Sequence, residues 1–161
     1  MSRAFVREDD QAGVTALPDR PISPHPNLVT RRGLALIERN VAAFRQQLAA
    51  ATAAEDQEAM ARAARELRYW AARHATAELT EPPADTETVV FGTAVTGVLP
   101  DGTQVTYRIV GEDEADPSEG RIAWTAPVAR LLLGSSVGDV RRIPAGELEI
   151  VAIDPTPEPP P

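Results

Sequence analysis

The residues best suited to chemistry are three carboxylates close together, Glu55, Asp56 and Glu58. Residues three positions apart share a helix face, so Glu55 and Glu58 would point the same way if this segment is helical. The same acids could instead stabilise a helix start, where the helix dipole favours each negative charge by about 0.3–1 kcal/mol. The chain has no cysteine, which excludes disulfides and thiolate chemistry. Its two histidines, His25 and His74, are far apart in the sequence, which argues against a histidine-based metal site.

Composition favours a folded, soluble protein that does not bind nucleic acids sequence-specifically. Hydrophobic residues make up 43% of the chain and charged residues 25%, but aromatic residues only 4%. Much of the apolar content is alanine, which suits thin helix–helix contacts better than a roomy enzyme pocket. The net charge of −8 argues against a general nucleic-acid binder, because neutralising phosphates needs a basic surface. No stretch has the length and apolarity of a signal peptide or a membrane span, so we expect a cytoplasmic protein without membrane contact.

The first half of the chain predicts an antiparallel helical hairpin over residues 28–83. Thr30 is a candidate N-cap, and Pro82 and Pro83 end the pattern. Two apolar seams with spacings of three and four are typical of paired helices; they comprise Leu34, Ile37, Val41, Phe44 and Leu48, then Met60, Ala63, Leu67, Trp70, His74 and Ala77. We expect the second helix to run from about Glu58 to Leu79. A single continuous helix that dimerises is the alternative.

The flanks of the hairpin differ in character. Residues 1–27 carry four prolines and few apolar residues, which predicts an extended or disordered arm. Residues 86–154 predict a β-rich domain: strands alternate around Val105 and Ile109, and Pro127 opens a short helix that Gly134 closes. Residues 112–119 read as an acidic loop. The proline-rich residues 155–161 predict a disordered tail.

Four segments of the β-rich region resemble the C-terminal domain of the GreA/GreB family of transcript-cleavage factors. They are Val90–Val95, Tyr107–Asp116, Ala126–Gly134 and Val137–Val140, which follow one another in this order across residues 89–153. The resemblance implies an α+β protein. Its parts would be an N-terminal coiled-coil hairpin and an FKBP-like antiparallel β domain with one short helix.

The resemblance also implies a function. Such factors bind RNA polymerase at the rim of its secondary channel and carry acidic residues at the hairpin tip to the active site. The chain would then be no enzyme itself and would bind no cofactor, but would act on the Mg²⁺ of the polymerase, transiently through Glu55 and Glu58. The polymerase-binding residues would be those around the short helix, Thr125, Ala126, Pro127, Val128 and Arg130.

Three other functions stay open at this stage. The first arm of the hairpin is several residues shorter than in the family, and each missing helical residue removes about 1.5 Å of reach. A Rnk-like regulator, which shares the Ala-Pro-Val sequence, would bind polymerase and compete with Gre factors without stimulating cleavage. An FKBP-like fold also suggests prolyl isomerase activity, although fold alone does not carry function. Finally, the hairpin could serve an adaptor that pairs with itself, which leaves the oligomeric state open.

Overall fold

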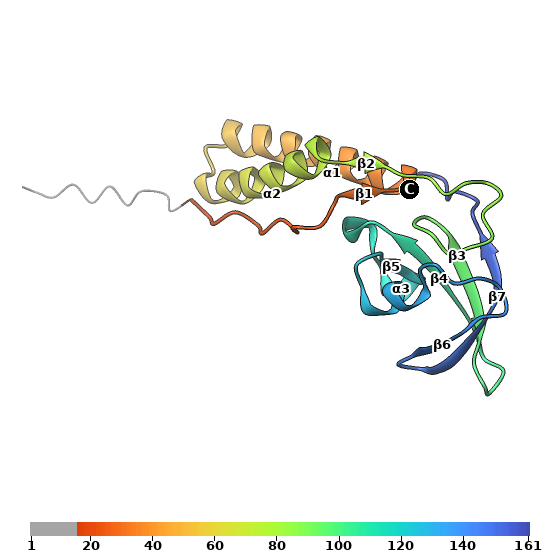
Figure 1. The fold of residues 1–161 in the computed structure, drawn as a ribbon. Helices are drawn as coiled ribbons and strands as arrows, with labels where there is room; N and C mark the ends of the chain where they lie inside the picture. Colours follow the sequence, from red (N-terminus) through yellow and green to blue (C-terminus); the bar gives the residue numbers. More distant parts are fainter. Residues whose placement is uncertain (1–15) are drawn as a thin grey trace, which may run out of the picture.

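The computed structural model describes residues 16–161 and shows a helical hairpin joined to a β domain (Figure 1). Residues 1–15, part of the predicted N-terminal arm, lie outside the described residues. The hairpin consists of α1 (Arg31–Ala53) and α2 (Gln57–Ala75). The predicted cap is confirmed, because the Thr30 hydroxyl accepts a hydrogen bond from the Gly33 amide at 2.9 Å. None of the described helices is long and apolar enough to cross a membrane.

The second helix ends earlier than its periodicity predicted. It stops at Ala75, and β2 (Glu78–Leu79) pairs in parallel with β1 (Leu28–Val29). The side-chain amide of Asn27 donates to the Arg73 carbonyl at 2.7 Å and so satisfies a carbonyl that the helix end leaves without a partner. The prediction of helix up to Leu79 was wrong because this strand pairing competes with the last helical turn.

The β domain is a five-stranded sheet with the order β5-β4-β3-β7-β6. The strands are β3 (Ala94–Val98), β4 (Gln104–Val110), β5 (Arg121–Ala123), β6 (Val140–Ile143) and β7 (Gly146–Asp154). The predicted α+β class is confirmed, and so is the short helix, α3 (Pro127–Leu132). The sheet, however, is mixed rather than antiparallel, because the 3₁₀ turns η1 (Glu112–Glu114) and η2 (Pro117–Glu119) bring β5 back parallel to β4. The core includes Val89, Val95, Ile109, Leu132, Leu148 and Ile150.

The arm and the tail both lie against the folded parts. Residues 16–27 run extended beside α2 (Figure 1), where the Pro18 carbonyl accepts from Arg65 at 2.7 Å. The Arg20 guanidinium lies 3.7 Å from the centre of the Tyr69 ring. The composition of the tail predicted disorder, but in the structure Glu158 accepts two hydrogen bonds from Arg121, at 3.0 and 3.2 Å.

A buried ion pair joins the hairpin to the β domain. The Arg73 side chain on α2 is 2% exposed, and its Nε donates to Asp113 Oδ2 at 2.5 Å. The Tyr69 hydroxyl donates to the other oxygen of the same carboxylate. Burial, together with the Asp113 hydrogen bond, raises the pKa of Tyr69 to about 12. The phenol therefore stays a donor throughout the neutral range.

The neighbouring acid holds the start of α1. Glu114 accepts from the Thr30 hydroxyl at 2.6 Å, and Arg32 Nη1 lies 3.6 Å from its other oxygen. Burial raises the pKa of Glu114, although the Thr30 hydrogen bond and the Arg32 charge oppose this. A Cβ at Gly33 would come within 2.7 Å of Glu114 Oε2, so glycine lets the helix approach the carboxylate.

We predict that Arg73→Met lowers the free energy of unfolding by about 3–5 kcal/mol, because Asp113 would be left as an uncompensated buried charge. Arg62→Met on the same helix is the matched control. Arg62 is 58% exposed and, within residues 16–161, pairs only with Glu58, so its loss should change stability by no more than about 0.5 kcal/mol. Denaturant unfolding measures both variants. The double variant Arg73→Met/Asp113→Leu should be more stable than Arg73→Met alone, and equal losses for Arg73→Met and Arg62→Met would contradict a structural ion pair.

Candidate functional site

The three predicted carboxylates lie at the hairpin tip, at the end of the hairpin away from the β domain (Figure 1). All three residues are exposed, but their backbone settings differ. Glu55 is in the turn with φ 54°, Asp56 is the N-cap of α2, and Glu58 is in the first turn of that helix. Our prediction that Glu55 and Glu58 share a helix face was therefore wrong, because Glu55 precedes the helix.

Two of the tip acids already form side-chain contacts within the hairpin. The Asp56 carboxylate accepts from the Ala59 amide at 3.0 Å, and Glu58 forms an ion pair with Arg62 one turn along. These contacts are those of an ordinary helix start. Within residues 16–161, Glu55 makes no side-chain hydrogen bond or ion pair, and no group of three or more acidic or histidine side chains could hold a metal ion.

The backbone conformation of Glu55 is costly for a side chain. A left-handed conformation costs an ordinary L-residue about 1–2 kcal/mol, and glycine or asparagine adopts it more easily. Stability alone would therefore not select glutamate at this position. The tip presents one carboxylate that the fold does not use, on a turn where its side chain is exposed.

The structure divides the five residues predicted around the short helix into two groups. Pro127 and Arg130 are exposed, as a binding surface requires. Ala126 and Val128 pack against the core, and the Thr125 hydroxyl donates to Glu112 at 3.0 Å. Three of the predicted residues therefore hold the segment in place, and two face outward.

Sequence analysis missed one outward residue of this segment, Leu131, which is 44% exposed. The signal was present in the helical spacing. Ala129 and Leu132 are three positions apart and fully buried, so α3 must turn Arg130 and Leu131 away from the core. We call Pro127, Arg130 and Leu131 the α3 surface.

Residues 84–155 match the family model described as the C-terminal domain of the GreA/GreB transcription elongation factors. This segment of the chain is thus similar to the C-terminal domain of the GreA/GreB family. It is 46% identical to transcription elongation factor GreA of Anaeromyxobacter sp. (strain K) over 89 residues, which is 52% of this chain and 51% of that protein. It is 53% identical to GreA of Methylococcus capsulatus over 70 residues, which is 40% of this chain and 44% of that protein. The chain thus spans about half the length of the curated GreA relatives it matches.

Similarity to solved structures covers a larger share of the chain, but is weak. Compared with GreA factor homolog 1 (Gfh1) of Thermus thermophilus, the identity is 23% and the TM-score 0.38, over 80% of this chain and 99% of that one. The GreA/GreB factor of Nitrosomonas europaea gives 20% identity and a TM-score of 0.38 over 79% of this chain and 98% of that one. The similarity to the GreA/GreB family therefore rests on residues 84–155.

We predict opposite effects of two neighbouring tip substitutions on the free energy of unfolding. Asp56→Ala should lower it by about 1 kcal/mol, because the N-cap of α2 is lost. Glu55→Gly should raise it by about 0.5–1 kcal/mol, because glycine adopts the left-handed conformation without a side-chain penalty. Denaturant unfolding monitored by helix content measures both. Loss of stability in Glu55→Gly similar to that in Asp56→Ala would show that the fold itself uses the Glu55 side chain.

Proposed function

We propose that this chain binds bacterial RNA polymerase and regulates transcription elongation; its GreA relatives are named transcription elongation factors. The observation that carries the proposal is the match of residues 84–155 to the GreA/GreB C-terminal domain, supported by 46% identity to a GreA factor over 89 residues. The relatives named above are GreA factors, which favours this function over a Rnk-like competitor. The chain has no catalytic role of its own and acts through the polymerase.

The β domain is the docking part, and the α3 surface contacts the rim of the secondary channel. An exposed leucine beside an exposed arginine offers both an apolar contact and a charge, the combination found at protein–protein interfaces. The residues behind it are fixed by the core and by the Thr125–Glu112 hydrogen bond. The surface is therefore preformed, which lowers the ordering cost of binding.

The hairpin is the part that enters the channel. Its first helix has 23 residues, which corresponds to about 34 Å at 1.5 Å per residue. The buried Arg73–Asp113 pair at its base keeps the hairpin in a defined direction relative to the docking surface. A rigid base matters because small angular errors there would move the tip by many ångströms.

At the tip, Glu55 is the carboxylate available to the polymerase. Mg²⁺ is commonly held by one or two carboxylates together with phosphate oxygens and water, so a single carboxylate is chemically sufficient. In a two-metal arrangement such a ligand would help to hold the second ion, which stabilises the attacking and leaving oxygens. The factor would contribute to this Mg²⁺ only in the complex, with no cofactor bound beforehand.

We predict that Arg130→Ser/Leu131→Ser weakens polymerase binding at least about tenfold, which corresponds to about 1.4 kcal/mol. The control is Arg142→Ser/Val151→Ser, which removes the same kinds of side chain from β6 and β7, where Arg142 is 85% and Val151 41% exposed. Affinity for the purified core polymerase measures both variants. If the two double variants bind equally well, α3 is not the docking surface.

Any cleavage stimulation should depend on Glu55 rather than on Glu58. Backtracked polymerase complexes are incubated with Mg²⁺ and the protein, and RNA shortening is followed. Glu55→Gln should reduce the rate at least tenfold because it removes the only tip carboxylate without a contact among the described residues. Glu58→Gln, which loses only its pair with Arg62, should retain most of the rate. Cleavage that survives removal of all three acids contradicts a role for the tip, whereas a wild type that displaces GreA without cleavage has the activity expected of a Rnk-like competitor.

A further inference from the structure

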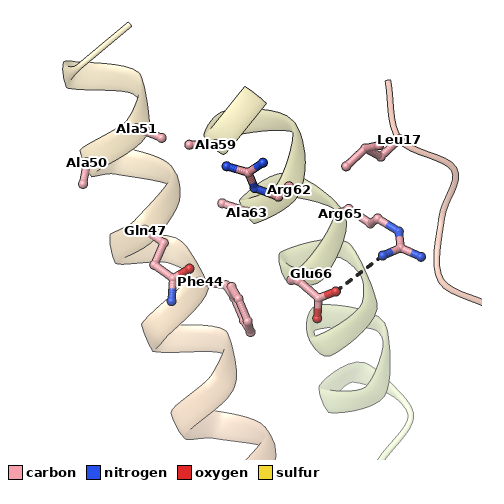
Figure 2. Close-up of a pocket in the computed structure, with 10 residues that line it drawn as sticks. All are labelled: Leu17, Phe44, Gln47, Ala50, Ala51, Ala59, Arg62, Ala63, Arg65 and Glu66. Carbon is pink, nitrogen blue, oxygen red and sulfur yellow. Dashed lines mark ion pairs between the residues drawn. The ribbon is translucent and has the colours of Figure 1, made fainter. Parts of the chain in front are cut away.

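A groove lies between the two helices near the tip. It has a volume of about 580 Å³, and Figure 2 shows small side chains of both helices facing it. We call it the tip groove; its apolar lining comprises Leu17, Phe44, Ala50, Ala51, Ala59 and Ala63. Nearer the base, Ile37 and Val41 are buried in the seam. At the tip the seam changes to alanine, whose methyl groups are too small to fill the space between two helices.

The N-terminal arm leads directly to this groove. Leu17 lines it, and Ala16 and Leu17 together lie beside Gln57 and Met60 at the start of α2. The arm is fixed at this place, because the Asp19 carboxylate accepts from Arg68 at 2.6 Å and Arg20 donates to Glu66 at 2.7 Å. The fifteen residues that precede Ala16 are therefore attached at the edge of an apolar groove.

The composition of these fifteen residues fits the groove. Phe5 and Val6 form a bulky apolar pair, and Glu8-Asp9-Asp10 is an acidic run. The groove is rimmed by Arg62 and Arg65, whose side chains are 58% and 34% exposed and pair with Glu58 and Glu66, respectively. Apolar side chains would thus meet the alanine seam while acids meet arginines.

The tether is long enough and raises the local concentration. Phe5 lies eleven positions before Ala16, a length of chain that can span up to about 36 Å. The groove wall from Phe44 to Ala51 is seven helical residues, or about 10 Å, so the chain can turn back at Gly13 and still reach it. A tether of this length gives an effective concentration in the millimolar range, which favours a segment of the same chain over a diffusing partner.

We propose that residues 1–15 dock in the tip groove, with Phe5 and Val6 covering the alanine seam and Glu8, Asp9 and Asp10 facing Arg62 and Arg65. The hairpin tip then consists of three segments rather than two. This intramolecular contact is independent of polymerase binding. Its role is to close the apolar seam at the slender end of the hairpin and to stiffen the turn that carries Glu55.

Disulfide trapping tests the contact in the full chain, which has no native cysteine. Ala4→Cys/Ala59→Cys places one thiol next to Phe5 and one in the groove. Ala4→Cys/Ala71→Cys is the matched control, because Ala71 is exposed on the same helix and does not line the groove. The groove pair should form an intramolecular disulfide at least tenfold faster than the control, and adding Phe5→Ser/Val6→Ser should remove this difference. Equal rates for the two pairs overturn the proposal, as does a disulfide that forms only between molecules, which would assign the groove to a second copy.

Hydrogen exchange provides a second measurement that does not alter the groove. In Phe5→Ser/Val6→Ser, the amides of residues 48–62 should exchange at least about tenfold faster than in the wild type, because the covering side chains are lost. The amides of β3, β4 and β7 should be unaffected. Unchanged exchange at the tip would overturn the proposal, since the groove would then be empty or filled by something other than residues 1–15.

Discussion

The arrangement of this molecule depends on one buried contact, the ion pair between Arg73 of α2 and Asp113 of η1. The Arg73 side chain is 2% exposed, and a charge so deeply buried is tolerated only when it is paired and hydrogen-bonded. The ion pair therefore forms only when the hairpin and the β domain meet in one orientation. The acids on either side extend it: Glu112 binds Ser23 of the arm at 3.1 Å, and Glu114 binds Thr30 before α1 at 2.6 Å. Three consecutive carboxylates thus hold the arm, the second helix and the first helix to the β domain.

This junction also connects the N-terminal arm to the segment that precedes α3. Glu112 accepts hydrogen bonds from Ser23 on the arm and from Thr125 just before α3, so one carboxylate holds both the arm and the docking segment. Thr125 is therefore a positioning residue for the α3 surface rather than a contact residue within it. The same arrangement explains why the backbone approaches so closely here: a Cβ at Gly111 would come within 2.5 Å of the Leu28 carbonyl oxygen.

Local patterns in the sequence predicted the elements but not the junction. The seams of the hairpin, the Thr30 cap and the Pro127 helix follow from spacing and cap chemistry, and all three are present. Residues 112–119 read as an acidic loop because nothing nearby in the sequence shows that Asp113 meets Arg73, forty positions away. The seam pattern likewise selected Trp70 and His74, whereas Arg73 is the most buried of the three. Charge type alone does not distinguish a buried arginine from a solvated one, so long-range pairs of this kind escape pattern analysis. At the tip, the spacing of Glu55 and Glu58 suggested a shared helix face. In the structure Glu55 lies in the turn before α2, so the two side chains do not share one.

The two ends of the hairpin satisfy different physical demands. The base is stabilised by buried charge pairs and by branched side chains such as Ile37 and Val41, which fix its direction. The tip has alanines in place of these side chains, which leaves a groove of about 580 Å³ between the helices at the cost of apolar burial. Under the proposed function, the hairpin enters a channel, and a rigid base directs it. The left-handed conformation of Glu55 is consistent with that function. A glycine there would be easier for the backbone, but it would remove the one tip carboxylate that makes no contact among the described residues. The contacts that stabilise the base and the carboxylate proposed to act at the tip are thus separated along a single pair of helices.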